Sequence, residues 1–222
     1  MLKNTLYLCI TLVLCSCVAT PPNNINNICD VFQEKEDWYT DVKESYQKWG
    51  VPIHVTMAIM HQESRFVADA QPPRPWLLGI IPWFRSSSAY GYAQAQDGTW
   101  QDYLANKNSR WGADRDDFAD ASDFIGWYCS ISHQRLGLSK WDTRKLYLAY
   151  HEGHTGYSRK TYLKKPWLLK VSKKVNVKSK KYRSQLSTCK DLIRKNLPPG
   201  SENPFKTWFQ RNNRKALNQS LK

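Results

Sequence analysis

Apolar positions recur at helical spacing along most of the chain. Over residues 30–48 they are separated by three, four and seven residues, which predicts a first amphipathic helix. The pattern breaks before Pro52, which suits the first turn of a second helix running to about Ser64. Similar patterns predict helices over about 97–107 (with Asp97 as N-cap), 116–136, 142–150 and 166–189. The sequence therefore predicts a mainly α-helical fold.

Residues 67–90 break this regularity. Four prolines and three consecutive serines predict a loop without a regular helix. The loop is nevertheless rich in large apolar side chains, namely Trp76, Leu77, Leu78, Ile80, Ile81, Trp83 and Phe84. A loop this long and apolar is typical of a functional element. We expect a lid or substrate wall, or alternatively a satellite cluster of the core.

The first residues carry the features of an export signal. Lys3 precedes an apolar run that is too short for a permanent membrane span and is typical of a secretory signal. The segment Leu14-Cys15-Ser16-Cys17 resembles a bacterial lipobox, which implies cleavage after Ser16 and acylation of Cys17; an ordinary signal peptide is the alternative. Residue 18 is Val rather than Asp, which by analogy implies release from the inner membrane. We therefore expect a signal peptide at 1–16, a tether at 17–28, and a lipoprotein of the outer membrane that faces the periplasm.

Export also changes the interpretation of the six cysteines. After processing, Cys29, Cys129 and Cys189 would remain in an oxidising compartment. Cys129 lies on the apolar stripe of a predicted helix, which indicates a buried free thiol. Cys29 and Cys189 flank the predicted domain at 29–190 and are the better pair. A disulfide between them would stabilise the fold by on the order of 5 kcal/mol, provided that the Cα atoms lie within about 7 Å.

The charge of the chain is concentrated near its end. The formal net charge is +14, and residues 159–222 hold 19 Lys and Arg against 2 acidic residues. This asymmetry indicates an anionic partner, either cell-wall polymer or lipid head groups, although a solvated basic face is an equal alternative. The export signal argues against nucleic acid, and no helix-turn-helix or zinc-finger pattern is present. Residues 191–222 are expected to form a basic tail, with one short amphipathic helix at 204–217.

The segment "HQESRF" holds the candidate catalytic group. Glu63 follows a largely apolar helix, and apolar surroundings raise the pKa of a carboxyl group toward 6 or 7. A carboxyl with such a pKa can protonate a glycosidic oxygen near neutral pH. Most glycosidases use two carboxylates, so the isolation of Glu63 needs an explanation.

Three segments in order supply one. "HQESRF", "AYGYAQAQDGTW" and "LAYHEGHTGY" resemble the three motifs of the lytic transglycosylase SLT domain, over roughly residues 30–165. The resemblance implies a lysozyme-like fold, peptidoglycan as substrate and no cofactor. It also implies that one Glu suffices. The substrate's own N-acetyl group assists at the anomeric carbon, and the same Glu then takes the proton of the muramyl C6 hydroxyl to give a 1,6-anhydro product.

The resemblance also implies roles around Glu63. Ser64 would touch the N-acetyl side of the substrate, Gly91, Tyr92 and Gln94 would line the sugar groove, and Tyr150 would lie against Glu63. Each role has a structural alternative. Ser64 can bond its own helix backbone, Gln94 can serve a turn, and Tyr150 can be a core aromatic with a satisfied hydroxyl.

Two departures from the family motifs concern substrate subclass. Gly-Tyr-Ala-Gln replaces the usual Gly-Leu-Met-Gln, and His151 and Glu152 place charge in a segment that is usually neutral. Glu152 is a further candidate for substrate binding, and it leaves open a lysozyme-type hydrolase in which it positions a water. A non-catalytic peptidoglycan-binding lipoprotein is a third possibility. The spacing of His151 and His154 does not fit a zincin helix, so no metal site is expected.

Overall fold

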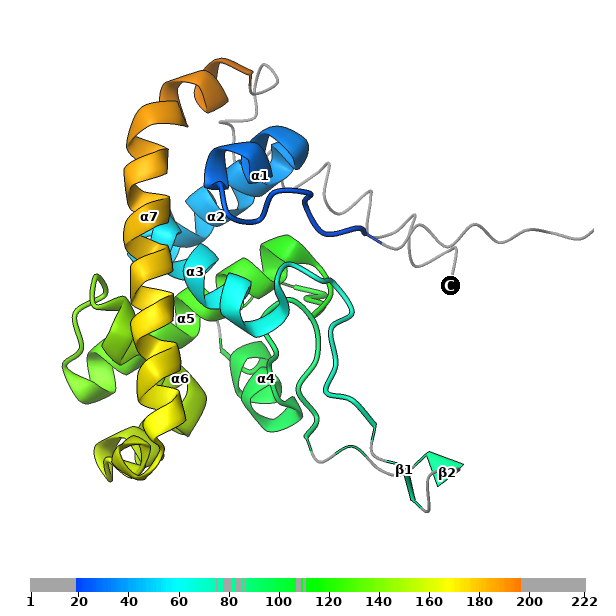
Figure 1. Ribbon diagram of the computed structural model, residues 1–222, viewed down its shortest axis with the longest axis vertical. Helices are drawn as coiled ribbons and strands as arrows, with labels where there is room; N and C mark the ends of the chain where they lie inside the picture. The colour runs from blue at the N-terminus through cyan, green and yellow to red at the C-terminus, as the bar shows by residue number, and fades with distance from the viewer. Residues whose placement is uncertain are drawn as a thin grey trace, which may run out of the picture.

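A computed structural model describes residues 19–74, 76–77, 81–82, 85, 87–106, 109 and 111–196 (Figure 1). Its α-helices are α1 (Ile28–Glu34), α2 (Glu36–Trp49), α3 (Ile53–Ser64), α4 (Asp97–Leu104), α5 (Phe118–Leu136), α6 (Thr143–Ser158) and α7 (Pro166–Asn196). A 3-10 helix, η1 (Thr161–Lys164), joins α6 to α7. The fold is mainly helical, as the sequence predicts.

Helix α5 forms the centre of the described fold. It packs against α2, α3, α4 and α6, and its first three turns are buried on every side. A helix with neighbours all round needs apolar or small side chains on every face. Asp117 caps its N-terminus by accepting a hydrogen bond from the backbone N–H of Asp120 at 3.0 Å. Asp117 therefore begins this helix.

The first predicted helix is in fact two helices. Lys35 has φ −117° and ψ 77°, outside the helical region, and it separates α1 from α2. Phe32 of α1 then packs edge-on against Tyr39 of α2, with ring centroids 5.4 Å apart. The prediction of one helix over 30–48 was wrong because this bend leaves the apolar spacing almost unchanged.

The chain between α3 and α4 contains no described helix, as predicted for residues 67–90. It does contain a small antiparallel pair, β1 (Trp76–Leu77) and β2 (Ile81–Pro82), with Trp76 opposite Pro82. Figure 1 shows this hairpin projecting away from the helices. The side chains at its tip lie outside the described residues, so its predicted role as a lid or wall stays a prediction.

Helix α7 runs along one side of the molecule and packs against α1, α3 and α6 (Figure 1). The disulfide predicted between Cys29 and Cys189 is present, with Cα atoms 6.0 Å apart, and it ties α1 to α7. Cys129 is a buried free thiol, and burial raises its pKa to about 12. Helix α7 continues to Asn196, past the predicted domain end at residue 190.

Part of the predicted tether is bonded to α7. The Tyr182 hydroxyl donates to the backbone carbonyl of Ile25, and Gln185 Oε1 accepts from the backbone N–H of Ile28 at 3.0 Å. Cys17 and the tail segment 204–217 lie outside the described residues. No helix in the described part of the chain combines the length and apolarity of a bilayer-crossing segment.

Candidate functional site

Glu63 lies in the last turn of α3, on an element whose preceding residues are almost all buried. Five of these residues are fully buried, namely Val55, Met57, Ala58, Ile59 and Met60. Glu63 itself keeps part of its surface accessible, yet protein atoms crowd its carboxyl. Burial raises the pKa of Glu63 from 4.5 to about 7. The carboxyl can therefore hold a proton at neutral pH, as the sequence predicts.

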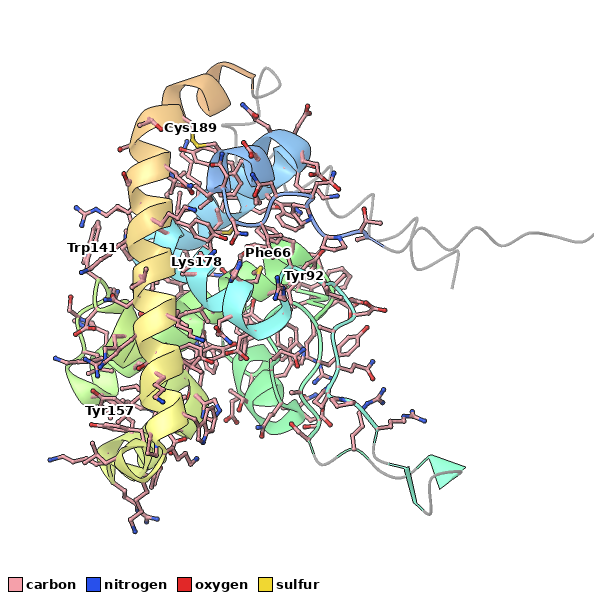
Figure 2. All side chains as sticks on the ribbon, in the orientation of Figure 1. Phe66, Tyr92, Trp141, Tyr157, Lys178 and Cys189 are labelled. Carbon is pink, nitrogen blue, oxygen red and sulfur yellow. A yellow bond between two sulfur atoms is a disulfide. The ribbon has the colours of Figure 1, made fainter. Side chains whose placement is uncertain are left out.

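The chain turns sharply directly after Glu63. Arg65 and Phe66 both have positive φ, 53° and 65°, which is rare for consecutive residues with a side chain. Phe66 is fully buried and packs against Trp38, with ring centroids 5.7 Å apart. Figure 2 shows Phe66 and Tyr92 near this end of α3. Packing of Phe66 thus holds a strained turn beside the candidate acid.

Ser64 is buried and uses its hydroxyl locally. Its Oγ donates to the Met60 carbonyl at 3.3 Å and accepts from the Phe66 backbone N–H at 3.1 Å. These bonds fasten the end of α3 to the turn that follows. They match the structural alternative for Ser64, and its contact with an N-acetyl group stays a prediction.

Tyr147 of α6 is hydrogen-bonded to Glu63. Its hydroxyl donates to the Glu63 carboxyl, and this bond opposes burial by lowering the pKa of Glu63. Burial, the Glu63 charge and the same bond raise the pKa of Tyr147 far above its usual value. Tyr147 is not among the residues predicted from the sequence. The available signal was its position three residues before Tyr150, which places the two tyrosines on one face of a helix.

Tyr150 uses its hydroxyl to join two of the sequence motifs. Its hydroxyl donates to the backbone carbonyl of Ala93 at 2.6 Å rather than to Glu63. Burial comes first, and the nearby Glu63 charge second, among the causes that raise the pKa of Tyr150 well above its usual value. Tyr150 therefore lies close to Glu63 and joins the third sequence motif to the second.

The second motif forms a tight turn, closed by a bridge between Tyr90 and Ala95. Gly91 has φ 78°, and a Cβ atom there would lie 2.0 Å from the carbonyl oxygen of Arg115. Its backbone N–H donates to the Ala70 carbonyl at 2.9 Å. Only glycine fits this combination of left-handed backbone and close approach. Gly91 is thus a structural requirement of the turn.

Tyr92 and Gln94 hold the same turn. The Tyr92 ring is buried and lies edge-on to Trp38 at 5.7 Å, so the side chain belongs to the core. Gln94 has φ 48°, and its Nε2 donates to the carbonyls of Ala70 and Gly91 at 2.7 and 2.9 Å. This geometry supports the turn alternative for Gln94. Contact of either residue with sugar stays a prediction.

Arg115 holds the same turn from a distance along the chain, and it was not among the residues predicted from the sequence. One guanidinium nitrogen, Nη1, donates to the Ser88 and Ala95 carbonyls and to Asp97 Oδ1, at 3.1, 2.9 and 2.7 Å. Its own carbonyl accepts from the Tyr92 backbone N–H at 3.1 Å. Nothing in the local sequence distinguishes this arginine, because its partners lie about twenty residues away along the chain.

The carboxylate of Glu152 is hydrogen-bonded to residues at the start of η1 and just before α7. Its side chain is 2% exposed and accepts from Lys165 Nζ at 2.7 Å and from His151 Nδ1 at 3.1 Å, and the Thr161 hydroxyl also donates to it. Burial alone would raise the pKa of Glu152, but the bonds from Lys165, Thr161 and His151 outweigh it and lower that pKa. Such a carboxylate anchors neighbouring elements and is poorly suited to activate water.

The chain turns again directly after Glu152. Gly153 has φ 73° and ψ 162°, which interrupts α6; helical structure resumes after this residue and ends at Ser158, beyond the predicted end at Tyr150. Beyond the kink, His154 Nε2 is 2.9 Å from Ser132 Oγ, while His151 faces Glu152. In the part of the chain that the structure describes, no group of three or more His, Cys, Asp or Glu side chains could hold a metal ion.

Comparison with known proteins places this site in context. A sequence model described as Transglycosylase SLT domain matches residues 5–189, well over half of the chain. No match was found among curated proteins. No match was found among solved structures.

Proposed function

Because the chain belongs to the Transglycosylase SLT domain family, which acts on peptidoglycan in the manner of lytic transglycosylases, we propose that Glu63 is its catalytic acid and base. One observation carries the proposal. Glu63 is a carboxyl whose pKa burial raises to about 7, and its partner is the uncharged hydroxyl of Tyr147. Burial is the largest cause of that raised pKa.

The chemistry follows from this single carboxyl. Protonated Glu63 gives its proton to the oxygen of the β-1,4 bond between MurNAc and GlcNAc, and the bond breaks as positive charge develops at the anomeric carbon. The N-acetyl group of the substrate supports that carbon from the opposite side. Glu63, now a carboxylate, takes the proton of the muramyl C6 hydroxyl, and the C6 oxygen closes on the anomeric carbon. Glu63 ends protonated, and a 1,6-anhydro sugar forms without water.

Tyr147 suits both halves of this cycle. Its hydroxyl hydrogen bond favours the charged form of Glu63, which is the form that remains after the glycosidic oxygen is protonated. Burial of Glu63 favours the neutral form that begins the cycle. The two opposing effects leave a pKa near neutrality, where a group can act as acid and then as base.

The test is substitution of Glu63 by Gln, combined with mass analysis of the muropeptides released from purified peptidoglycan. Gln keeps the shape of Glu but cannot transfer a proton, so activity should fall by at least about a hundredfold. Products of the unmodified protein should be lighter by one water than hydrolysis products. Wild-type activity in the variant would overturn the role of Glu63.

The same measurement decides between the alternatives. Hydrated products would indicate a lysozyme-type hydrolase, and the absence of release would indicate a non-catalytic binding protein. The position of Glu152 favours the transglycosylase, because its carboxylate is held by Lys165 and Thr161.

We also propose that Cys17 carries lipid and anchors the protein to the outer membrane, facing the periplasm. The support is the lipobox-like segment that ends at Cys17 and the apolar run before it. Cys17→Ser should move the protein from the membrane fraction to the soluble periplasmic fraction, because acyl chains supply most of the membrane affinity. Persistence of Cys17→Ser in the membrane fraction would indicate a second anchor, for which the basic residues of 159–222 are the candidate.

A further inference from the structure

Trp167 is a half-exposed aromatic residue in the first turn of α7, with 53% of its surface accessible. We propose that Trp167 is a stacking platform for a sugar ring of the peptidoglycan strand, at a subsite remote from Glu63. The proposal rests on the proposed function, because it assigns a further part of the same substrate. A single exposed Trp would need no explanation, but contacts connect Trp167 to Glu63.

A continuous path of contacts leads from Glu63 to Trp167. The Tyr147 hydroxyl bonds Glu63. The Tyr147 ring lies 6.5 Å from the ring of His151, one turn further along α6. His151 in turn lies edge-on to Trp167, with centroids 5.2 Å apart and planes at 76°. The exposure of these rings rises along the path, from buried Tyr147 to exposed His151 and Trp167. The path therefore leads from the reacting group to the surface.

The hydrogen bonds that Glu152 accepts set the position of Trp167. Glu152 follows His151 on α6, and its carboxylate accepts from Thr161 in η1 and from Lys165 just before α7. These bonds fix the beginning of α7 against α6, two residues before Trp167. His151 and Glu152, which depart from the third family motif, thus both act on Trp167. His151 contacts Trp167, and Glu152 holds the segment that carries it.

The chemistry of the exposed surface fits a sugar. The C–H groups on one face of a pyranose ring are apolar and carry partial positive charge, while the face of an indole ring is apolar and partly negative. The edge-on His151 supports Trp167 without lying parallel to the indole face. A glycan strand is also a repeating polymer, so a strand with one sugar at Glu63 can place another ring at a neighbouring surface.

Trp141 offers a matched control. It is exposed to the same extent, 53%, but it packs beside His54, in the first turn of α3, at 5.5 Å. Arg183 of α7 also lies 5.2 Å from its ring. Glu63 lies in the last turn of the same α3, so Trp141 is near the opposite end of that helix. Figure 2 shows Trp141 beside α7, away from the labelled Phe66 and Tyr92.

The test measures binding in the full chain carrying Glu63→Gln, so that the ligand is not cleaved. Calorimetric titration with MurNAc-GlcNAc oligosaccharides of increasing length should show affinity that rises with length. Adding Trp167→Ala should weaken binding of the longest oligosaccharide about tenfold, the scale of one aromatic stacking contact. Trp167→Phe should restore most of this loss, and Trp141→Ala should bind like the parent. Equal affinity of the parent and Trp167→Ala for every length would overturn the proposal.

A second variant tests whether Glu152 positions Trp167. Glu152→Gln should weaken binding of the longest oligosaccharide by acting through Trp167, so the double variant with Trp167→Ala should bind no more weakly than Trp167→Ala alone. Additive losses would assign Glu152 a separate contact and overturn its positioning role.

These outcomes are distinct from failure of the proposed function. Full activity of Glu63→Gln on peptidoglycan would remove Glu63 from catalysis, whereas the difference in affinity between the parent and Trp167→Ala reports on Trp167. A melting temperature equal to that of the parent excludes misfolding of Trp167→Ala as the cause of weaker binding.

Discussion

The Tyr147 hydroxyl donates a hydrogen bond to the Glu63 carboxyl, across the contact between α6 and α3. The bond lowers the pKa of Glu63, while burial, the larger effect, raises it to about 7. Tyr147 is thus placed to tune the group that carries the proposed chemistry. Its effect is measurable, because the two influences act in opposite directions.

Tyr147→Phe should shift the pH dependence of activity. Without the hydroxyl, the charged form of Glu63 loses a partner and its pKa rises above the present value of about 7. A general acid works only while protonated, so activity falls as pH rises through this pKa. The fall should therefore move to higher pH, by roughly half a unit to one unit, in a profile of kcat/KM.

Tyr128→Phe is the control for this shift. Tyr128 is also buried, but its hydroxyl donates to the Ala149 carbonyl at 3.2 Å. Its removal should leave the alkaline fall where it is. A Tyr147→Phe profile that coincides with that of the unmodified protein would show that the hydrogen bond does not tune the acid.

Glu63→Gln should make the protein more stable at alkaline pH. The pKa of the Glu63 carboxyl is about 7 in the folded protein and near 4.5 in the unfolded chain, so the folded state binds the proton more tightly. Stability is then lost as pH rises from about 4.5 to about 7, and the cost persists above that range. Gln avoids the cost, and the variant should gain up to about 3 kcal/mol at pH 8. Urea unfolding at pH 4 and pH 8 measures the difference, and stability curves that run parallel over this range would contradict it.

Gly91→Ala should disrupt the turn that carries the second motif. The backbone at Gly91 has φ 78°, and the new Cβ would lie 2.0 Å from the Arg115 carbonyl oxygen. Since neither backbone segment can move far, unfolding free energy should fall by about 3 kcal/mol or more. Gly98→Ala in α4 meets no atom within 4 Å and should be neutral or stabilising by up to about 1 kcal/mol. Equal stability of the two variants, measured by urea unfolding, would contradict the steric argument.

Removal of the Cys29–Cys189 disulfide should destabilise the fold. The bond joins residues separated by 160 positions. Closing a loop of that length lowers the conformational entropy of the unfolded chain, which stabilises the folded state by on the order of 5 kcal/mol. The double variant Cys29→Ser with Cys189→Ser should therefore unfold at a clearly lower urea concentration. Cys129→Ser, which touches a buried free thiol, removes no cross-link and separates packing effects from this loss. An unchanged midpoint in the double variant would show that α7 docks without the bridge.

Local chemistry in the sequence determined much of this protein. Apolar spacing predicted most of the helices but not the bend at Lys35 that separates α1 from α2. Pro52 marked the start of α3, and Asp117 and Asp142 cap α5 and α6 by accepting hydrogen bonds from backbone N–H groups. The same signals placed Glu63 at the end of a buried helix. The position of Cys29 and Cys189 at either end of the predicted domain identified the disulfide. These features depend on neighbours in the chain or on simple periodicity.

The tertiary structure decided what depends on residues far apart. Tyr147 rather than Tyr150 bonds Glu63, because the rotation of α6 against α3 selects which of two tyrosines on one face reaches the carboxyl. Glu152 was ambiguous until Thr161 and Lys165 were seen to bond it. Arg115 shows no local signal, since the carbonyls it bonds belong to a turn about twenty residues earlier. A one-dimensional pattern records which face a residue occupies, but only packing determines which partner that face meets.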